Sequence, residues 1–253
     1  MGDRPVLCHQ NKKGETPWNA LTSAYPPPAA GPGRQLIRSG RVTVDGVVAA
    51  RREEKYPDDA VITVDGEAIS AGGYTYLMLN KPAGLVSATE DPRQATVLSL
   101  LPEHLRRVGL FPAGRLDRDT VGLLLLTNDG PLAHALLSPV HHVDKIYLAE
   151  VEGVLEESDE AAFREGMVLQ SGLHCLPAGL ERLDESRALV TLHEGKYHQI
   201  KRMLAARGKP VRYLKRLTFG PLELDQSLGE GEWRPLTGEE IGALQEAVKP
   251  GRP

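Results

Sequence analysis

The stretch FPAGRLDRDTVGLLLLTNDG, Phe111 to Gly130, places a turn and four charged residues directly before a run of four leucines. The segment GLLLLT has the length and flanks of a fully buried strand. A turn that feeds such a strand is held rigidly, so Asp117 is predicted to lie at a sheet edge. Between Arg115 and Arg118, this carboxylate suits a nucleophile or base. From the pattern alone, a structural ion pair within the turn is the more ordinary interpretation.

Outward from this stretch, strand and helix patterns are mixed at short spacings. Strands are predicted at 74–80, 122–127, 145–153, 187–195 and 210–224, and helices at 95–105, 128–138, 158–166 and 196–208. Ser158 is the expected cap of the third helix, and Asn128 or Asp129 that of the second. TGEE, Thr237–Glu240, is a capping box that opens a last helix. This mixture predicts an α+β fold around a largely antiparallel sheet.

Composition excludes several classes of protein. The 253 residues are 41% hydrophobic, enough for an ordinary core. Cys8 and Cys175 cannot form a disulfide framework and match no zinc spacing, which favours a reducing cytoplasm. No apolar run approaches the roughly 20 residues that cross a bilayer, and the first residues lack the apolar core of a signal peptide.

The charge is segregated along the chain. The net charge is -4, yet Glu194 is followed by eight basic residues: Lys196, Lys201, Arg202, Arg207, Lys209, Arg212, Lys215 and Arg216. Such segregation predicts a basic face on an acidic protein, suited to nucleic acid. A solvated helix face beside a strand edge is the alternative.

Patterns for other chemistries are weak. The histidines are scattered, and His141–His142 has no carboxylate or cysteine at ligand spacing, so no metal site is expected. Asp117 and Asp119, about 7 Å apart in an extended chain, supply the two acids that a glycosidase needs, but nothing in the sequence marks a sugar-stacking cleft. No phosphate-binding glycine loop is present. The residues alone therefore indicate an α+β protein with a basic face and a charged turn.

Four motifs resemble, in chain order, those of the ribosomal-RNA pseudouridine synthases. AGRLDRDTVGLLLLTNDG (113–130) is similar to the turn that carries the family's catalytic aspartate. LNKPAGLVSA (79–88) resembles its first strand–turn motif, and LSPVHHVDKIYLAEVEG (137–153) its tyrosine motif. Residues 193–224, which begin HEGKYHQIKRM, resemble its basic helix motif. The wording of the last two motifs is most similar to the RsuA-like branch, which acts on small-subunit ribosomal RNA.

The resemblance implies roles for individual residues. Asp117 would be the catalytic nucleophile or base, in a reaction that needs no cofactor and no metal. Lys201 matches the basic residue that pairs with it, Tyr147 would stack on a flipped-out uracil, and Arg115 would fill the vacated space or hold the adjacent phosphate. Leu116 and Ile200 would line the pocket, and RNA contacts would come from Arg38, Arg41, Arg118, Lys196, His198, Arg202, Lys215 and Arg216.

The resemblance also divides the chain. Residues 75–250 correspond to the catalytic domain, 71–74 to a linker, and 34–70 to part of a small, ribosomal-protein-S4-like α/β RNA-binding module. Only the end of that module's second helix, RQLIRSG (34–40), is recognisable, so the module is expected to be incomplete. Residues 1–33, rich in proline and glycine, are expected to form a flexible lead-in. Val121 replaces the family's usual small polar residue, which a buried strand should tolerate.

The leading hypothesis is a monomeric, cytoplasmic enzyme that converts one uridine of 16S ribosomal RNA to pseudouridine, in a small-subunit assembly intermediate and away from membranes. A synthase for a large-subunit (23S) position is the first alternative. The second is a catalytically idle RNA-binding or ribosome-assembly protein.

Overall fold

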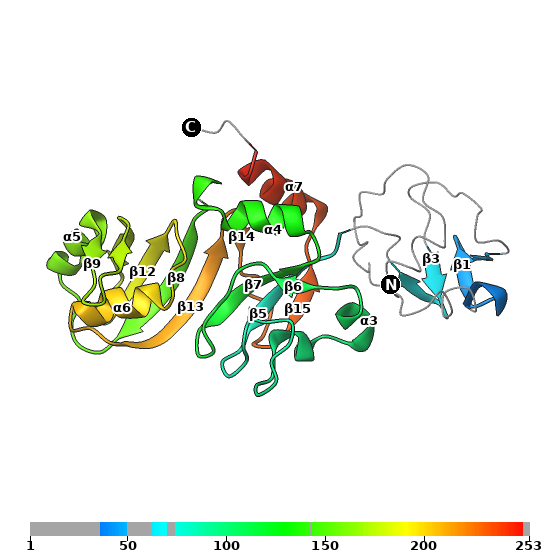
Figure 1. Cartoon of the computed structure of the whole chain (residues 1–253), viewed down its shortest axis with the longest axis horizontal. Coiled ribbons are helices and arrows are strands. Elements are labelled where there is room, and N and C mark those ends of the chain that lie inside the picture. Colours follow the sequence, from blue (N-terminus) through cyan, green and yellow to red (C-terminus); the bar gives the residue numbers. More distant parts are fainter. Residues whose placement is uncertain (1–35, 50–61, 70–73, 142, 250–253) are drawn as a thin grey trace. The chain divides into compact units, whose positions relative to one another are not determined.

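The computed structural model describes residues 36–49, 62–69, 74–141 and 143–249. The chain divides into two compact units (Figure 1). The first takes in the described residues up to Tyr76, with Leu101–Phe111 and Thr127–Asp129, and the second takes in the rest. The predicted lead-in, 1–33, and the linker apart from Tyr74 lie outside the described residues.

The first unit contains a small sheet built on two VDG turns. Helical residues 36–38 end at Gly40, whose φ is 70°. The strands are β1 (Val42–Val44), β2 (Val47–Val48), β3 (Ile62–Val64) and β4 (Glu67–Ile69), in the order β2-β1-β3-β4. In both turns the aspartate and the glycine have positive φ, the geometry of a type I′ hairpin turn. The helix end predicted from the sequence is confirmed.

The main sheet belongs to the second unit, except for the strand-end residues Tyr76, Phe111 and Thr127, which belong to the first. Its described strands lie in the order β11-β12-β8-β13-β7-β5-β15, with β14 paired to β13 and β6 to β7. Their bounds are β5 (Tyr76–Lys81), β6 (Phe111–Pro112), β7 (Val121–Thr127), β8 (Lys145–Val151), β11 (Gly179–Arg182), β12 (Arg187–Leu192), β13 (Val211–Phe219), β14 (Leu222–Glu223) and β15 (Trp233–Pro235). A separate hairpin pairs β9 (Met167–Val168) with β10 (His174–Cys175).

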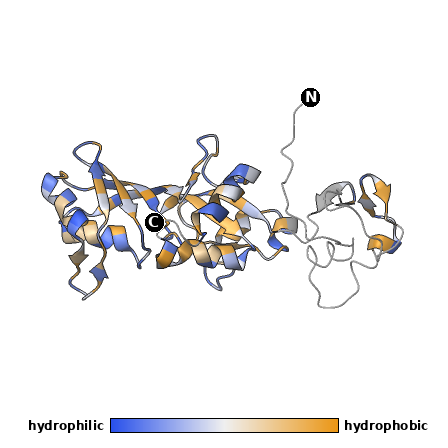
Figure 2. Ribbon diagram, turned by 90° about the horizontal axis from the view of Figure 1, so that it is seen from above, coloured by the Kyte–Doolittle hydropathy of each residue, from blue (hydrophilic) through white to orange (hydrophobic). Residues whose placement is uncertain are grey.

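The sheet is largely antiparallel, as predicted. β8 runs antiparallel to both β12 and β13, and β15 runs antiparallel to β5. β13 and β7 run parallel. Every residue of β7 is buried, whereas burial alternates along β8, because one strand is covered on both faces and the other on one. Figure 2 shows the matching pattern, with hydrophilic residues concentrated in loops and apolar residues interleaved along the strands.

The helices begin where local geometry allows. They are α3 (Glu103–Arg106), α4 (Gly130–Leu137), α5 (Glu157–Glu165), α6 (Gln199–Ala206) and α7 (Gly238–Ala247), with 3-10 turns at Val97–Leu100 and Pro139–His141. The single helix predicted over 95–105 is wrong: Pro102 separates a 3-10 turn from α3. The capping box at Thr237 is confirmed.

One predicted cap needs correction. Glu156, and not Ser158, caps α5, in a capping box with Asp159. The Asn128 amide oxygen accepts from the Thr75 N–H just before β5, and the Asp129 carboxylate accepts from the Tyr76 hydroxyl, both at 2.7 Å. The choice of Asn128 or Asp129 as the cap of α4 stays a prediction.

The parallel pairing of β7 with β13 requires a glycine on β7. Gly122 has φ 97°, and a Cβ there would lie 2.3 Å from the carbonyl oxygen of Arg216. Its neighbour Val121 is 3% exposed, so the apolar substitution is accommodated in the core. Among the described residues, no helix is long and apolar enough to cross a membrane.

Candidate active site

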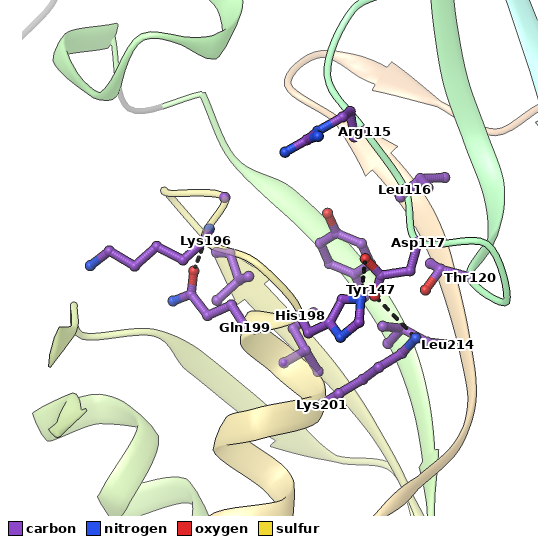
Figure 3. Close-up of a pocket in the computed structure, with 13 residues that line it drawn as sticks. Arg115, Leu116, Asp117, Thr120, Tyr147, Lys196, His198, Gln199, Lys201 and Leu214 are labelled. Atoms are coloured by element: carbon purple, nitrogen blue, oxygen red, sulfur yellow. Dashed lines mark hydrogen bonds and ion pairs between the residues drawn. The ribbon is translucent and has the colours of Figure 1, made fainter. Parts of the chain in front are cut away.

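A pocket opens beside the turn that precedes β7. It is lined by residues of this turn, of β8 and β13, of the end of β12 and of the loop leading into α6. The lining residues are Arg115, Leu116, Asp117, Thr120, Tyr147, Leu192, Gly195, Lys196, His198, Gln199, Ile200, Lys201 and Leu214. The predicted catalytic residues, distant in sequence, thus share one pocket (Figure 3).

Asp117 is contacted by two nitrogen-bearing side chains from the α6 side. The Lys201 ammonium lies 3.0 Å from its Oδ2, and His198 Nε2 lies 3.4 Å from its Oδ1 (Figure 3). The Asp117 side chain keeps 24% of its surface exposed. The carboxylate is therefore held by an ammonium and an imidazole yet open to a ligand.

Lys201 is shared between two carboxylates. Its ammonium also lies 2.5 Å from Oδ1 of Asp119, whose side chain is 76% exposed. Burial alone would lower the pKa of Lys201, but hydrogen bonds to Asp119 and Asp117 raise it above its ordinary value. The hydrogen bond from Lys201 in turn lowers the pKa of Asp119. The pocket therefore contains a charged ammonium against the Asp117 carboxylate.

The backbone of the turn is fixed by a buried lysine. Lys81, at the end of β5, is fully buried, and its ammonium donates to the carbonyl oxygens of Asp117 and Arg118 at 3.1 and 3.2 Å. It also donates to the carbonyls of Thr120 at 2.9 Å and Pro82 at 3.0 Å. Desolvation lowers the pKa of Lys81 to about 8, against the attraction of Asp119 and Asp117.

Apolar and aromatic side chains form the wall of the pocket. Tyr147 is 8% exposed and lies beside Asp117 (Figure 3). Leu116 and Ile200 are buried and line the same pocket. An aromatic ring beside a carboxylate offers a flat surface for a planar ligand such as a nucleobase.

Comparison with known proteins assigns the family. Residues 75–206 match the family model described as RNA pseudouridylate synthase. The chain belongs to that family. An RNA pseudouridine synthase from Bacillus subtilis, named YtzG, is 44% identical over 84% of this chain and 91% of its own length. Ribosomal small subunit pseudouridine synthase A of Escherichia coli is 41% identical over 82% of this chain and 90% of its own.

A solved structure supports the fold. A crystal structure of a pseudouridylate synthase matches with a TM-score of 0.65 and 39% identity, covering 84% of this chain and 92% of that one. This protein is accordingly a pseudouridine synthase with the family's α+β catalytic fold, and the family resemblance of its four motifs is confirmed. The likeness of residues 34–70 to an S4-like module stays a prediction.

Several residues predicted to contact RNA lie in or beside the synthase pocket. Arg115 is exposed and projects over the pocket, while Lys196 and His198 line it (Figure 3). Arg118 is exposed, and its Nε donates to the carbonyl of Gly84 at 3.1 Å. Arg118 therefore joins the turn after β5 to the turn that carries Asp117.

The basic face predicted from the sequence is smaller than the count of cations suggested. Arg207 donates to the buried Asp159 at 2.8 Å, and Arg212 pairs with Glu152 at 3.1 Å. Lys209 hydrogen-bonds the carbonyl of Val154. The acid-rich segment around α5 thus neutralises part of the basic one, because the fold brings the two together.

Arg216 requires a correction. It was predicted to contact RNA, but it is 2% exposed, and its Nε donates to the Leu123 carbonyl at 2.6 Å. The guanidinium lies over the Phe219 ring, 5.1 Å from its centroid. Lys215, its neighbour on β13, is half-buried. A guanidinium buried between β7 and β13 cannot reach a phosphate.

The remaining predicted RNA contacts have protein partners or lie in the first unit. Arg202 hydrogen-bonds the Ser171 hydroxyl, and Lys196 pairs with Glu194 at 2.8 Å. In the first unit, Arg38 is exposed and Arg41 pairs with Asp65 through its Nε at 2.8 Å. These cations stay candidates for RNA contact.

Three features of the site escaped sequence reasoning: the lysine clamp of Lys81, the second carboxylate on Lys201, and the exposed ring of Tyr197. Lys81 carried a signal, since a lysine at the end of an apolar strand must find acceptors if the strand is buried. The second carboxylate depends on the tertiary contact of α6 with the turn before β7, and the exposure of Tyr197 depends on the loop before α6.

Proposed function

We propose that this enzyme converts one specific uridine of small-subunit ribosomal RNA to pseudouridine, with Asp117 as the catalytic carboxylate. The contact that carries the proposal is the 3.0 Å ion pair of Asp117 with Lys201, in a pocket walled by Tyr147. The relatives named ribosomal small subunit pseudouridine synthase A support the choice of RNA. We expect a monomer that acts in the cytoplasm on a small-subunit assembly intermediate.

The reaction is an isomerisation in which atoms and electrons balance internally. The bond from ribose C1′ to uracil N1 breaks, the base rotates, and C1′ bonds to C5. The hydrogen that leaves C5 is replaced by one that N1 gains. A carboxylate can begin this sequence by attacking the sugar or by removing a sugar proton, and in this proposal Asp117, which lines the pocket, takes one of these two roles.

The target uridine must leave its stack to reach Asp117. Tyr147 supports the flipped uracil from the wall of the pocket, and Ile200 closes the apolar side. Arg115 projects over the mouth, where its guanidinium holds the adjacent phosphate or fills the vacated space (Figure 3). Lys201, whose pKa is raised by its carboxylate partners, stays a cation and orients the Asp117 carboxylate.

Mapping pseudouridines in ribosomal RNA, from cells with and without the gene, tests this function. We expect one small-subunit site to disappear on deletion and to return with the wild-type gene. The Asp117→Asn variant should bind RNA but restore nothing, because the amide cannot act as nucleophile or base. If that variant turned over within about tenfold of wild type, its barrier would be raised by only about 1.4 kcal/mol or less, and Asp117 would be excluded from its role.

The same map separates the alternatives. Loss of a large-subunit site instead would move the substrate to 23S RNA while keeping the chemistry. An unchanged map would favour an RNA-binding protein that has lost catalysis.

A further inference from the structure

The loop before α6 holds an exposed aromatic pair next to the catalytic carboxylate. The rings of Tyr197 and His198 are stacked, with centroids 3.8 Å apart and an interplanar angle of 19°. Tyr197 is 70% exposed, while His198 lines the pocket and reaches Asp117 through its Nε2. The tyrosine ring is therefore the next layer outward from the pocket.

The backbone that presents this pair is strained. His198 has φ 51° and ψ 33°, the left-handed region, and it is the N-cap residue of α6. A residue other than glycine held in such a conformation costs on the order of 1–3 kcal/mol, and such residues gather at functional sites. Here the strain turns the imidazole toward Asp117 and leaves the tyrosine ring facing solvent.

The loop is nonetheless held firmly at its base. The buried Gln199 donates from Nε2 to Glu194 Oε1 at 2.7 Å, and Glu194 also accepts from the Leu176 N–H at 3.0 Å. The Lys196 N–H donates back to Gln199 Oε1 at 3.1 Å. The ring of Tyr197 is exposed on a loop whose base these hydrogen bonds hold, so it lacks the burial that normally stabilises a large ring.

We propose that Tyr197 is a stacking platform for the nucleobase next to the target uridine. Bases in splayed, single-stranded RNA stack on exposed aromatic rings. With the target uracil in the pocket, the neighbouring base stacks on the outer face of Tyr197. The base, Tyr197 and His198 then form one continuous stack that ends at Asp117. This inference rests on the proposed function, because it requires an RNA in the pocket.

The test measures binding, so that it does not depend on turnover. In the Asp117→Asn background, we would measure affinity for uridine-rich RNA heptamers with 2-aminopurine on one side of a central uridine. Stacking on an aromatic contributes about 1–3 kcal/mol per base, so Tyr197→Ala should weaken binding roughly 5- to 150-fold. Tyr197→Phe should bind within about twofold of the parent, since it keeps the ring's stacking face. Quenching of 2-aminopurine should be lost only in the alanine variant.

Two controls make the result specific. Tyr74 is a second exposed tyrosine outside the pocket, 47% exposed, so Tyr74→Ala should leave affinity unchanged. Replacing the neighbouring nucleotide by an abasic one should abolish the effect of Tyr197→Ala. Equal affinities of the tyrosine and alanine proteins for the intact heptamer would overturn the platform, as would an equal loss with the abasic RNA. An unchanged pseudouridine map would refute the proposed function instead.

Discussion

The ammonium of Lys81 lies 2.9 Å from the carbonyl oxygen of Thr120 and 3.1 Å from that of Asp117. One side chain from β5 thereby fixes both ends of the turn that carries Asp117. Because the lysine is fully buried, its charge is stabilised by backbone dipoles and not by water. Lys81 thus holds the backbone of Asp117, while Lys201 contacts its carboxylate.

The buried lysine predicts an unusual dependence of stability on pH. The pKa of Lys81 in the folded protein is about 8, below its ordinary value of 10.5. Between these values the unfolded chain binds more protons, so the contribution of Lys81 to stability rises with pH. From about pH 7.5 to about pH 10, the unfolding free energy of wild type should gain roughly 1–3 kcal/mol relative to Lys81→Met.

Chemical denaturation across this pH range provides the measurement. Lys145, also buried and with a pKa lowered to about 8 by desolvation, should show the same sign in a Lys145→Met variant. Lys249→Met, at an exposed lysine, is the surface control. A relative stability that falls with pH would mean that the Lys81 pKa is not lowered.

Because the backbones of β7 and β13 lie close together at Gly122, we expect Gly122→Ala to be poorly tolerated. The new methyl group would meet the Arg216 carbonyl at 2.3 Å and its nitrogen at 2.9 Å. We expect a loss of about 3 kcal/mol or more in the free energy of unfolding. Gly208→Ala is the matched control, since φ is 72° there and nothing lies within 4 Å of the added Cβ. It should cost only about 1–2 kcal/mol. Similar losses for both variants would show that φ, and not the contact, decides.

Local sequence patterns were enough to predict most of the strands and helices. Four leucines after a charged turn predicted β7, and the capping box at Thr237 predicted α7. Both features depend on residues that are neighbours in the sequence, so they can be recognised without knowing the tertiary structure. The start of α6 could not be predicted in the same way. His198 adopts a left-handed conformation that its neighbours do not specify, so the helix begins at Gln199 and Tyr197 stays outside it.

Arg216 shows which part of the site could not be predicted from the sequence. Its place in a run of cations predicted a surface contact, whereas tertiary packing buried it against Phe219. Alternation along β13 is interrupted by register shifts, so the face of each residue could not be read from spacing. The pairing of Lys201 with Asp117 was predicted from the family resemblance, not from charge, and the two groups lie 3.0 Å apart.

The burial of Arg216 predicts a contrast in salt dependence. Each phosphate neutralised contributes about 0.7–0.9 to the slope of log affinity against log salt. Arg115→Met should reduce this slope by nearly one, whereas Arg216→Met should leave it unchanged, because its guanidinium is enclosed by protein. Titrations of small-subunit RNA at several salt concentrations would measure both slopes. A reduced slope for Arg216→Met, in a protein that unfolds as wild type does, would place that residue on RNA.

The sharing of Lys201 predicts unequal roles for its two carboxylates. Its ammonium lies 2.5 Å from Asp119 and 3.0 Å from Asp117. Asp119 is 76% exposed, and exposed ion pairs stabilise a protein by less than about 1 kcal/mol. Asp119→Asn should therefore change stability little and turnover by less than about tenfold, since Lys201 keeps its contact with Asp117.

Lys201→Met should behave differently, because it leaves the half-buried Asp117 carboxylate without its ammonium. We expect turnover to fall by about a hundredfold or more, close to 3 kcal/mol in barrier, with partial recovery in Lys201→Arg. Pseudouridine formation at saturating RNA would compare the three variants, and chemical denaturation would confirm that each is folded. If Asp119→Asn lost as much activity as Lys201→Met, Asp119 would have to take part in the reaction, and Asp117 could no longer be the only catalytic carboxylate.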